Sequence, residues 1–548
     1  MPTSKETFMT QTLAQTLFKS ADKLRKNIDA AEYKHIVLGL VFLKYISDSF
    51  QAIFERVQND GGDTEDKDEY LAHNAFFVPP KARWGYIMEN AKQSNIGSLL
   101  DAAMQTIEQE NPSLKGVLPK VYAKENLDSI CLGGLIDLLS NLSLSGEGGG
   151  KTAQSSDILG HIFEYFLGEF ALSEGKKGGQ FYTPKSVVEL LITMLEPYKG
   201  RVFDPCCGSG GMFVQSELFV QSHQGSIDDI SIYGQESNQT TWRLAKMNLA
   251  IRQIDSSQVK WNSEGSFLND AHKDLKADFV IANPPFNDSD YSGELLKQDG
   301  RWKFGIPPAT NANYAWIQHF LYHLAPKGVA GFVLAKGSLT SNTATEGEIR
   351  KNLIESNLID CIVNLPAKLF LNTQIPASLW FIRRSKTNKE ILFIDARNCG
   401  ELINRKNRIL THEDIQKISQ TYHAWRKAQN PQDGDSKNPV SHTDSPLCHA
   451  EALAEESQSI KSKQDSKSLE SLPPYSDIKG FCKSASLQEV AALGYTLTPG
   501  RFVGLEENEQ DFDFEAEFTR LKEELQSQMQ EEEALNQRIL ANLALVEK

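Results

Sequence analysis

Arg201-Val202-Phe203-Asp204-Pro205-Cys206-Cys207-Gly208-Ser209-Gly210-Gly211 is the stretch that decides the fold, because an apolar run leads through a carboxylate into a glycine-rich turn. Residues 212–218 then have helical character, so the segment predicts a strand, a turn and a helix. Glycines in such a turn let the backbone approach a ligand closely and aim N–H groups at it. The spacing Gly-Ser-Gly-Gly differs from the Gly-x-Gly-x-x-Gly of dinucleotide folds, so we expect a nucleotide-like turn without phosphate chemistry.

A second strand is predicted over residues 230–235 and ends at Glu236. An acidic residue at this position is placed to bind the ribose hydroxyls of an adenosine. A solvated strand end explains Glu236 equally well, so the residue alone does not decide between the two interpretations.

A third segment joins a strand to a rigid polar loop. The apolar run 277–282 leads directly into Asn283, Pro284, Pro285 and Phe286. Each proline fixes its own φ and restricts the residue before it, so the Asn283 amide and the Pro284 carbonyl have a preset geometry. Two acceptors aimed at one point suit an amine with two N–H donors, and Phe286 offers an aromatic face. An ordinary proline-stiffened loop is the alternative, and the position after a buried strand favours a ligand site.

Strand-like runs alternate with helical ones from about residue 170 to 400. Further runs lie at 329–334, 359–364, 377–382 and 391–395. Alternation of this kind predicts an α/β fold with a doubly wound, mostly parallel sheet. Residues 1–165 show apolar residues at three- and four-residue spacing and are predicted to form a helical N-terminal domain.

These segments together resemble the S-adenosylmethionine-dependent amino-methyltransferases of DNA, which have a Rossmann-like sheet. The resemblance implies that a cofactor turn, an acid for the ribose and a loop for the target amine all match. The implied substrate contacts are Asn283, Pro284, Pro285 and Phe286. The implied S-adenosyl-L-methionine contacts are Gln180, Phe181, Tyr182, Thr183, Pro184, Lys185, Asp204, Gly208, Ser209, Gly210, Glu236 and Asp270, with Asp270 placed at the adenine ring. Locally, Thr183 also reads as the N-cap of a helix that begins at Pro184.

Both ends of the chain resemble the modification subunit of type I restriction-modification systems. Residues 20–25, 42–48 and 163–167 match the helical N-terminal domain of that family, and residues 494–504 match its C-terminal segment. The resemblance implies methyl transfer to the N6 amine of adenine in DNA. It also implies four kinds of partner: double-stranded DNA, a DNA-sequence specificity subunit, a second copy of the chain and a restriction subunit with nuclease and translocase activity.

The charge balance keeps other functions open. Lys and Arg number 57 against 72 Asp and Glu, a net charge of −15, whereas a protein that grips DNA alone carries a basic surface. A partner that holds the DNA would remove this difficulty. A protein-glutamine N-methyltransferase uses the same Asn-Pro-Pro loop without a basic surface, and a non-catalytic assembly subunit would retain the fold.

The resulting domain boundaries are 1–165 for the helical domain and 166–427 for the methyltransferase domain. Residues 428–476, rich in Ser, Asp, Lys and Gln, are predicted to be a variable or disordered insertion, and 477–548 to be a C-terminal segment with a partner-binding helix. That coiled-coil-like helix carries Phe514, Phe518, Leu521, Leu525, Leu535, Ile539 and Val546 at four-three spacing.

Cysteine usage and apolar runs indicate the cellular compartment of the protein. Seven scattered cysteines without Cys-x-x-Cys spacing predict neither a disulfide framework nor a metal site. The N-terminus lacks an apolar signal core, and the apolar run 36–43 is far shorter than the ~20 residues that span a bilayer. We therefore expect a cytoplasmic protein that does not enter a membrane.

Overall fold

The predicted strands lie in one sheet of the computed structural model. In the described part of the chain this sheet has nine strands, in the order β11-β8-β6-β7-β5-β4-β1-β2-β3. Neighbours pair in parallel except at β5–β7, β6–β7 and β8–β11, so the sheet is mostly parallel, as predicted. The strands are β1 (Gly200–Asp204), β2 (Ile230–Glu236), β3 (Val259–Trp261), β4 (Ala277–Ala282), β5 (Leu324–Ala335), β6 (Ile359–Asn364), β7 (Ala377–Arg383), β8 (Glu390–Asp395) and β11 (Cys482–Ser486), with β9 (Glu401–Leu402) and β10 (Arg408–Ile409) in a separate hairpin.

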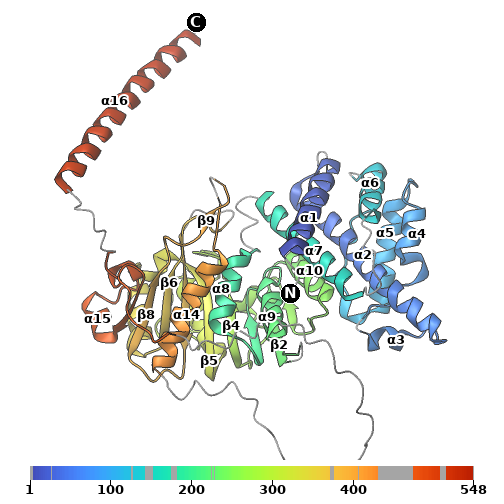
Figure 1. Cartoon of the computed structure of the whole chain (residues 1–548), viewed down its shortest axis with the longest axis horizontal. Coiled ribbons are helices and arrows are strands. Elements are labelled where there is room, and N and C mark those ends of the chain that lie inside the picture. The colour runs from blue at the N-terminus through green and yellow to red at the C-terminus, as the bar shows by residue number, and fades with distance from the viewer. Residues whose placement is uncertain are drawn as a thin grey trace, which may run out of the picture. The chain divides into compact units, whose positions relative to one another are not determined.

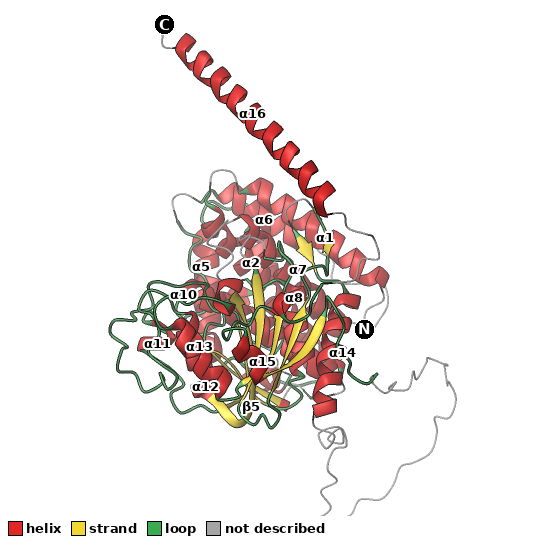
Figure 2. Cartoon of the chain, turned by 90° about the vertical axis from the view of Figure 1, so that its left-hand side faces the viewer, coloured by secondary structure: helices red, strands yellow, loops and turns green. Residues whose placement is uncertain are grey.

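Each face of the sheet has its own hydrophobic core, which confirms the doubly wound arrangement. Successive strand residues point to opposite faces, so Val202 joins one core and Phe203 the other. Figure 2 shows the strands between the two helical layers. One layer consists of α8 (Lys185–Leu195), α9 (Gly211–Ser222) and α14 (His412–Gln429), and the other of α11 (Gly265–Leu268), α12 (Asn313–His323), α13 (Glu346–Glu355) and α15 (Leu487–Ala492).

The N-terminal helices form a third core that continues into the sheet domain (Figure 1). Leu244, Met247 and Ile251 of α10 (Gln239–Ile251) belong to this core. The predicted boundary at residue 165 falls inside a continuous helix, α7 (Thr152–Ser173). The helices are α1 (Ser4–Leu24), α2 (Ala30–Asn59), α3 (Lys67–Ala72), α4 (Trp84–Glu89), α5 (Ile96–Glu110), α6 (Ser129–Ser140) and α7 (Thr152–Ser173), with short 3-10 turns at Pro80–Ala82, Pro112–Leu114, Lys336–Leu339 and Pro499–Arg501.

Helix α2 is long and apolar enough to cross a membrane by length and composition alone. In the structure 78% of its apolar window is buried inside the protein. Its apolar side chains, such as Leu40 and Phe42, are fully buried in the N-terminal core. The apolar character of α2 is therefore explained by packing.

The C-terminal region divides into two parts. β11 pairs antiparallel with β8 and extends the sheet, and the first compact unit runs from Met1 to Val503. The second unit, Gly504–Lys548, contains α16 (Phe514–Val546), on which Phe518, Leu521, Leu525, Met529 and Leu535 are exposed. The structure describes residues 4–25, 28–73, 75–124, 127–141, 152–173, 182–223, 225–226, 229–370, 376–404, 407–429, 473–505 and 514–546, so most of the predicted insertion 428–476 lies outside it.

Candidate active site

The turn after β1 and the end of β2 are tied together by hydrogen bonds. Asp204 ends β1, is buried, and accepts a hydrogen bond from the Cys206 backbone N–H at 3.0 Å. The Gly208 N–H donates to Oε2 of Glu236 at 3.0 Å, because β1 and β2 run in parallel and end side by side. The structure thus places Glu236, the residue predicted to bind the ribose, against the predicted cofactor turn.

The two acids of this region have raised pKa values. Burial raises the pKa of Asp204 to about 7, the negative charge of Glu236 adds to the rise, and the hydrogen bond from Cys206 opposes it. Burial likewise raises the pKa of Glu236, against the hydrogen bonds from Asn238 and Gly208. A raised carboxyl pKa means that the protein alone stabilises the negative charge poorly, so a cationic ligand beside these acids would be bound favourably.

Gly210 has a different role from the one expected. Its φ of 78° at the N-cap of α9 lies in the left-handed region, which favours glycine. A Cβ atom there would meet Ala245 and Leu249 of α10 at 3.6 Å, and Gly210 does not line the cavity described next. The turn geometry therefore requires a glycine at this position.

An open cavity lies beside the turn. The lining brings together seven of the predicted site residues, namely Tyr182, Thr183, Lys185, Asp204, Gly208, Ser209 and Asn283. Gln180 and Phe181 lie outside the described residues. Pro184 occupies the N-cap of α8, so the helix begins one residue later than predicted and Thr183 is not its cap.

Sequence reasoning missed several residues of the cavity wall. Glu164 and Leu167 come from α7, and Asn248 comes from α10, where its Nδ2 donates to the Ser209 carbonyl at 2.9 Å. The available signal was positional, since α7 directly precedes the segment with the predicted methionine contacts. The other lining residues that were not predicted are Val188, Cys206, Cys207, Gly211, Met212, Val214 and Gln215.

The loop after β4 presents an unsatisfied acceptor at this cavity. Asn283 Nδ2 donates to Thr183 Oγ1 at 3.0 Å, whereas the buried Oδ1 of Asn283 has no hydrogen-bond partner among the residues that the structure describes. Phe286 lies edge-on to Phe370, with ring centroids 5.7 Å apart. Asn287, which follows, is fixed to α12 because it exchanges two hydrogen bonds with Asn313. A rigid loop therefore holds an acceptor for which the described part of the chain supplies no donor.

Comparison with known proteins assigns the family. The N-6 DNA Methylase model matches residues 154–511, and the HsdM N-terminal domain model matches residues 13–139. The HindI methylase subunit of the Haemophilus influenzae type I restriction enzyme is 43% identical over 79% of this chain and 91% of its own length. The MjaIX methylase subunit of Methanocaldococcus jannaschii is 37% identical over 97% of this chain and 91% of its own.

The chain belongs to the N-6 DNA methylase family. Its relatives are methylase subunits of type I restriction enzymes. The fold agrees with the crystal structure of a type I methyltransferase subunit from Streptococcus thermophilus, at a TM-score of 0.69 over 90% of this chain and 99% of the other, with 24% sequence identity.

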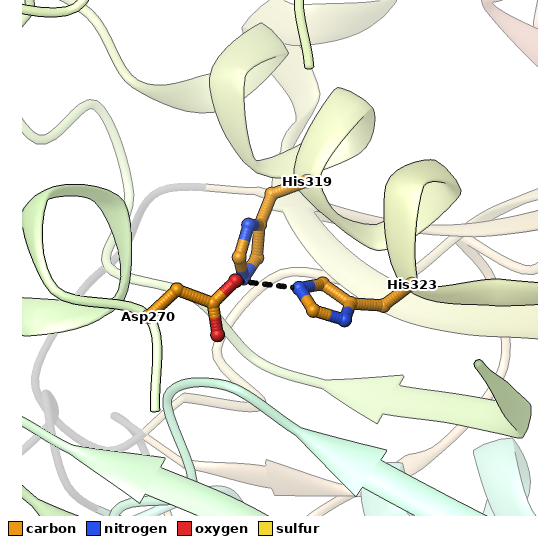
Figure 3. A group of neighbouring side chains, drawn as sticks. All are labelled: Asp270, His319 and His323. Carbon is orange, nitrogen blue, oxygen red and sulfur yellow. Dashed lines mark hydrogen bonds and ion pairs between the residues drawn. The ribbon is translucent and has the colours of Figure 1, made fainter. Parts of the chain in front are cut away.

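In this methylase Asp270 faces His323 (Figure 3) and does not line the cavity. His323 Nε2 lies 2.9 Å from Asp270 Oδ2, and the His272 N–H donates to Oδ1 at 2.8 Å. Although burial would raise the pKa of Asp270, the hydrogen bond from His323 and the nearby imidazoles lower it well below its usual range. These partners bind the carboxylate, and Asp270 is not among the residues that line the cavity.

Asp270, His319 and His323 also offer three ligand atoms within 4.8 Å of one another, which suggests a cation site. The hydrogen bonds favour another assignment. Arg301 Nη1 lies 2.9 Å from His319 Nδ1, and because a guanidinium only donates, Nδ1 must accept this hydrogen bond. A neutral His319 then carries its proton on Nε2, so neither ring nitrogen is free to bind a metal ion. His323 Nδ1 faces the Leu275 carbonyl at 3.1 Å and must donate, so His323 and Asp270 share the second proton. The cluster is therefore a buried network of hydrogen bonds.

Proposed function

We propose that this methylase transfers a methyl group from S-adenosyl-L-methionine to the N6 amine of adenine in DNA, as the modification subunit of a type I restriction-modification complex. The observation that carries the proposal is the buried, unpartnered Oδ1 of Asn283 beside the cavity. An exocyclic amine would donate to this oxygen and remove the cost of leaving it unsatisfied.

The cavity suits S-adenosyl-L-methionine because its wall combines carboxylates with close backbone. The cofactor supplies a methyl group already activated by a positive sulfonium. Asp204, Gly208, Ser209, Tyr182, Thr183 and Lys185 would hold it, and Glu236 would bind the ribose beside Gly208. Gln180, Phe181 and Pro184 belong to the same proposed contact segment.

Asn283 and Phe286 would act on the substrate by positioning. A base must leave the duplex to reach such a site. Asn283 Oδ1 and the Pro284 carbonyl would accept hydrogen bonds from the adenine amine, while Pro285 keeps the loop rigid and Phe286 stacks on the base. Holding the amine in line with the methyl group lowers the barrier without covalent catalysis, because orientation removes much of the entropic cost.

Partners would hold the DNA, since the chain carries a net charge of −15. The proposed assembly contains double-stranded DNA, a specificity subunit, a second copy of the chain and a restriction subunit, and it works in the cytoplasm. The exposed apolar residues of α16, such as Phe518, Leu521 and Leu525, suit a helical partner.

Labelled cofactor distinguishes the proposed reaction from its alternatives. The chain, purified with its specificity subunit, should transfer tritiated methyl groups to adenine in duplex DNA. Transfer to glutamine in a peptide would establish a protein methyltransferase, and cofactor binding without transfer would establish an assembly subunit. Sequencing that detects modified adenines, with and without the gene, is the matching test in cells.

Removal of residues 504–548 tests the assembly separately. The first compact unit ends at Val503, so the sheet and the cavity remain. Cofactor binding should survive, while co-purification with the specificity subunit and site-specific methylation should fail. Full assembly by the shortened chain would place the partner contact elsewhere.

A further inference from the structure

Helix α7 belongs to two parts of the molecule at once. Ile162, Phe163 and Phe166 are buried in the N-terminal core, whereas Glu164 and Leu167 line the cofactor cavity. The Tyr182 hydroxyl packs against α7, because a Cβ atom on Gly168 would lie 3.3 Å from it. The helical region therefore supplies one wall of a cavity whose other walls come from the sheet domain.

The Glu164 carboxylate is held in place by a network that ends on the cofactor turn. Arg252 Nη2 lies 3.2 Å from Glu164 Oε2 and also donates to the Gly160 carbonyl at 3.1 Å. Arg252 Nη1 donates to Asn248, whose Nδ2 in turn donates to the Ser209 carbonyl at 2.9 Å. Only about a fifth of the Glu164 side chain is exposed, so the charge sits in a partly desolvated and fixed position.

The charges of the cavity wall match an amino-acid group. Among the described lining residues, Glu164 and Asp204 are the acids and Lys185 is the base. Asp204 ends β1 and already accepts a hydrogen bond from a backbone N–H. Glu164 lines the cavity from helix α7. The methionine end of the proposed cofactor carries an ammonium and a carboxylate, and a charged hydrogen bond to a fixed acid is among the stronger polar contacts.

We propose that Glu164 accepts a hydrogen bond from the α-ammonium of the methionine moiety, so that the N-terminal helical region directly contacts the bound cofactor. This inference rests on the proposed function, in which the cavity binds S-adenosyl-L-methionine. It makes Glu164 a binding residue that neither the glycine-rich turn nor the 180–185 segment contains.

The test compares two ligands that differ only in the ammonium. S-adenosylhomocysteine lacks the sulfonium charge, so its α-ammonium is its cation, and the second ligand replaces that amino group with hydrogen. In the full-length protein Glu164→Gln should weaken S-adenosylhomocysteine by about 10- to 100-fold, the usual value of a hydrogen bond to a charged group, and leave the deamino ligand unchanged. Calorimetric titration gives both affinities.

Glu169→Gln is the matched control, because Glu169 lies on the same helix and does not line the cavity. It should change neither affinity. Glu164→Asp keeps the charge opposite Arg252 but shortens the side chain, and it should show the same selective loss if Glu164→Gln fails to fold.

The results distinguish a wrong contact at Glu164 from a wrong cofactor assignment. Equal weakening of both ligands, or no weakening of either, would overturn the contact to the ammonium. Failure of the unmodified protein to bind S-adenosylhomocysteine would instead overturn the cofactor assignment on which the inference rests.

Discussion

Two buried aspartates in the same domain behave in opposite ways. Asp204 at the end of β1 has a pKa raised to about 7, because burial disfavours its charge and the negative Glu236 adds to this effect. Asp270 in the loop that precedes β4 keeps a lowered pKa because His323 donates to it, even though burial acts in the same direction on both acids. The protein satisfies one carboxylate and leaves the other for a ligand.

The same contrast extends to other polar groups around each acid. Arg301, beside Asp270, donates to Asp299, to His319 and to the carbonyls of Ser266 and Phe267. Asn283, beside the cavity, keeps an acceptor without a partner. The groups beside Asp270 are thus held by partners within the protein, whereas Asn283 presents its free acceptor at the cavity.

Breaking the satisfied pair should have the largest effect, and it should be on stability. Asp270→Ala leaves two buried donors, His323 Nε2 and the His272 N–H, without a partner, and each such loss costs about 1–3 kcal/mol in the free energy of unfolding. Denaturant unfolding measures this loss, and Asp270→Asn combined with His323→Gln should recover part of it. Loss of S-adenosylhomocysteine binding by a variant that remains folded would return Asp270 to the cofactor site.

Removing the unsatisfied acceptor should affect catalysis and spare stability. Asn283→Ala is expected to lower methyl transfer by about 100- to 1000-fold, the usual effect of losing one preorganised hydrogen bond in a transition state. Cofactor affinity and the unfolding midpoint should stay near those of the unmodified protein. Asn283→Asp retains an acceptor and should keep more activity than the alanine variant. Near-normal turnover by Asn283→Ala would remove Asn283 from the substrate contacts.

Phe286 tests the aromatic part of the substrate side. Phe286→Ala should weaken capture of the flipped base by about 1–3 kcal/mol, the usual contribution of stacking on an unpaired base, whereas Phe286→Tyr should be tolerated. Binding to DNA that carries an abasic site at the target position is the control, since it offers no base to stack. If the alanine variant binds both DNAs as the unmodified protein does, the ring only packs against Phe370.

The raised pKa of Asp204 predicts a smaller effect of pH on cofactor binding. The positive cofactor favours the ionised carboxylate, so its affinity should fall by up to about tenfold per unit as the pH drops below 7, and binding should expel a proton there. The sign for folding of the free protein is opposite, because a raised carboxyl pKa contributes stability at low pH that is lost as the pH rises through 7. Titrations in buffers of different ionisation enthalpy check the first statement, and Asp204→Asn should abolish the dependence.

The sequence predicted the sheet well because its strands follow local rules. Buried β-branched runs before Asp204, Glu236 and Asn283 were located from pattern alone, and all three ends lie on one edge. β3 was too short to delimit, and β11 was missed because residues 482–486 pair with β8 about 90 positions earlier, a contact that local pattern does not encode.

The sequence located those cavity residues that belong to recognisable motifs. Thr183, Asp204, Gly208 and Asn283 meet at the cavity, as their places at strand and helix ends implied. Glu164 and Asn248 were not found, because helical residues enter a site through tertiary packing and carry no signature of their own. The predicted contact of Asp270 with the adenine ring stays a prediction, and chain position alone could not show that His323 lies against its carboxylate.

The return of the chain to the sheet edge has a practical consequence. β11 follows the long segment 430–472 and runs antiparallel beside β8, from Cys482 opposite Ile394 to Ser486 opposite Glu390, while Phe502 stacks on Phe393 at 3.9 Å. Two separate polypeptides that divide the chain within that segment should therefore reassemble when expressed together, held by this ladder and stack. Such a split protein would let cofactor binding be switched on by bringing its halves together.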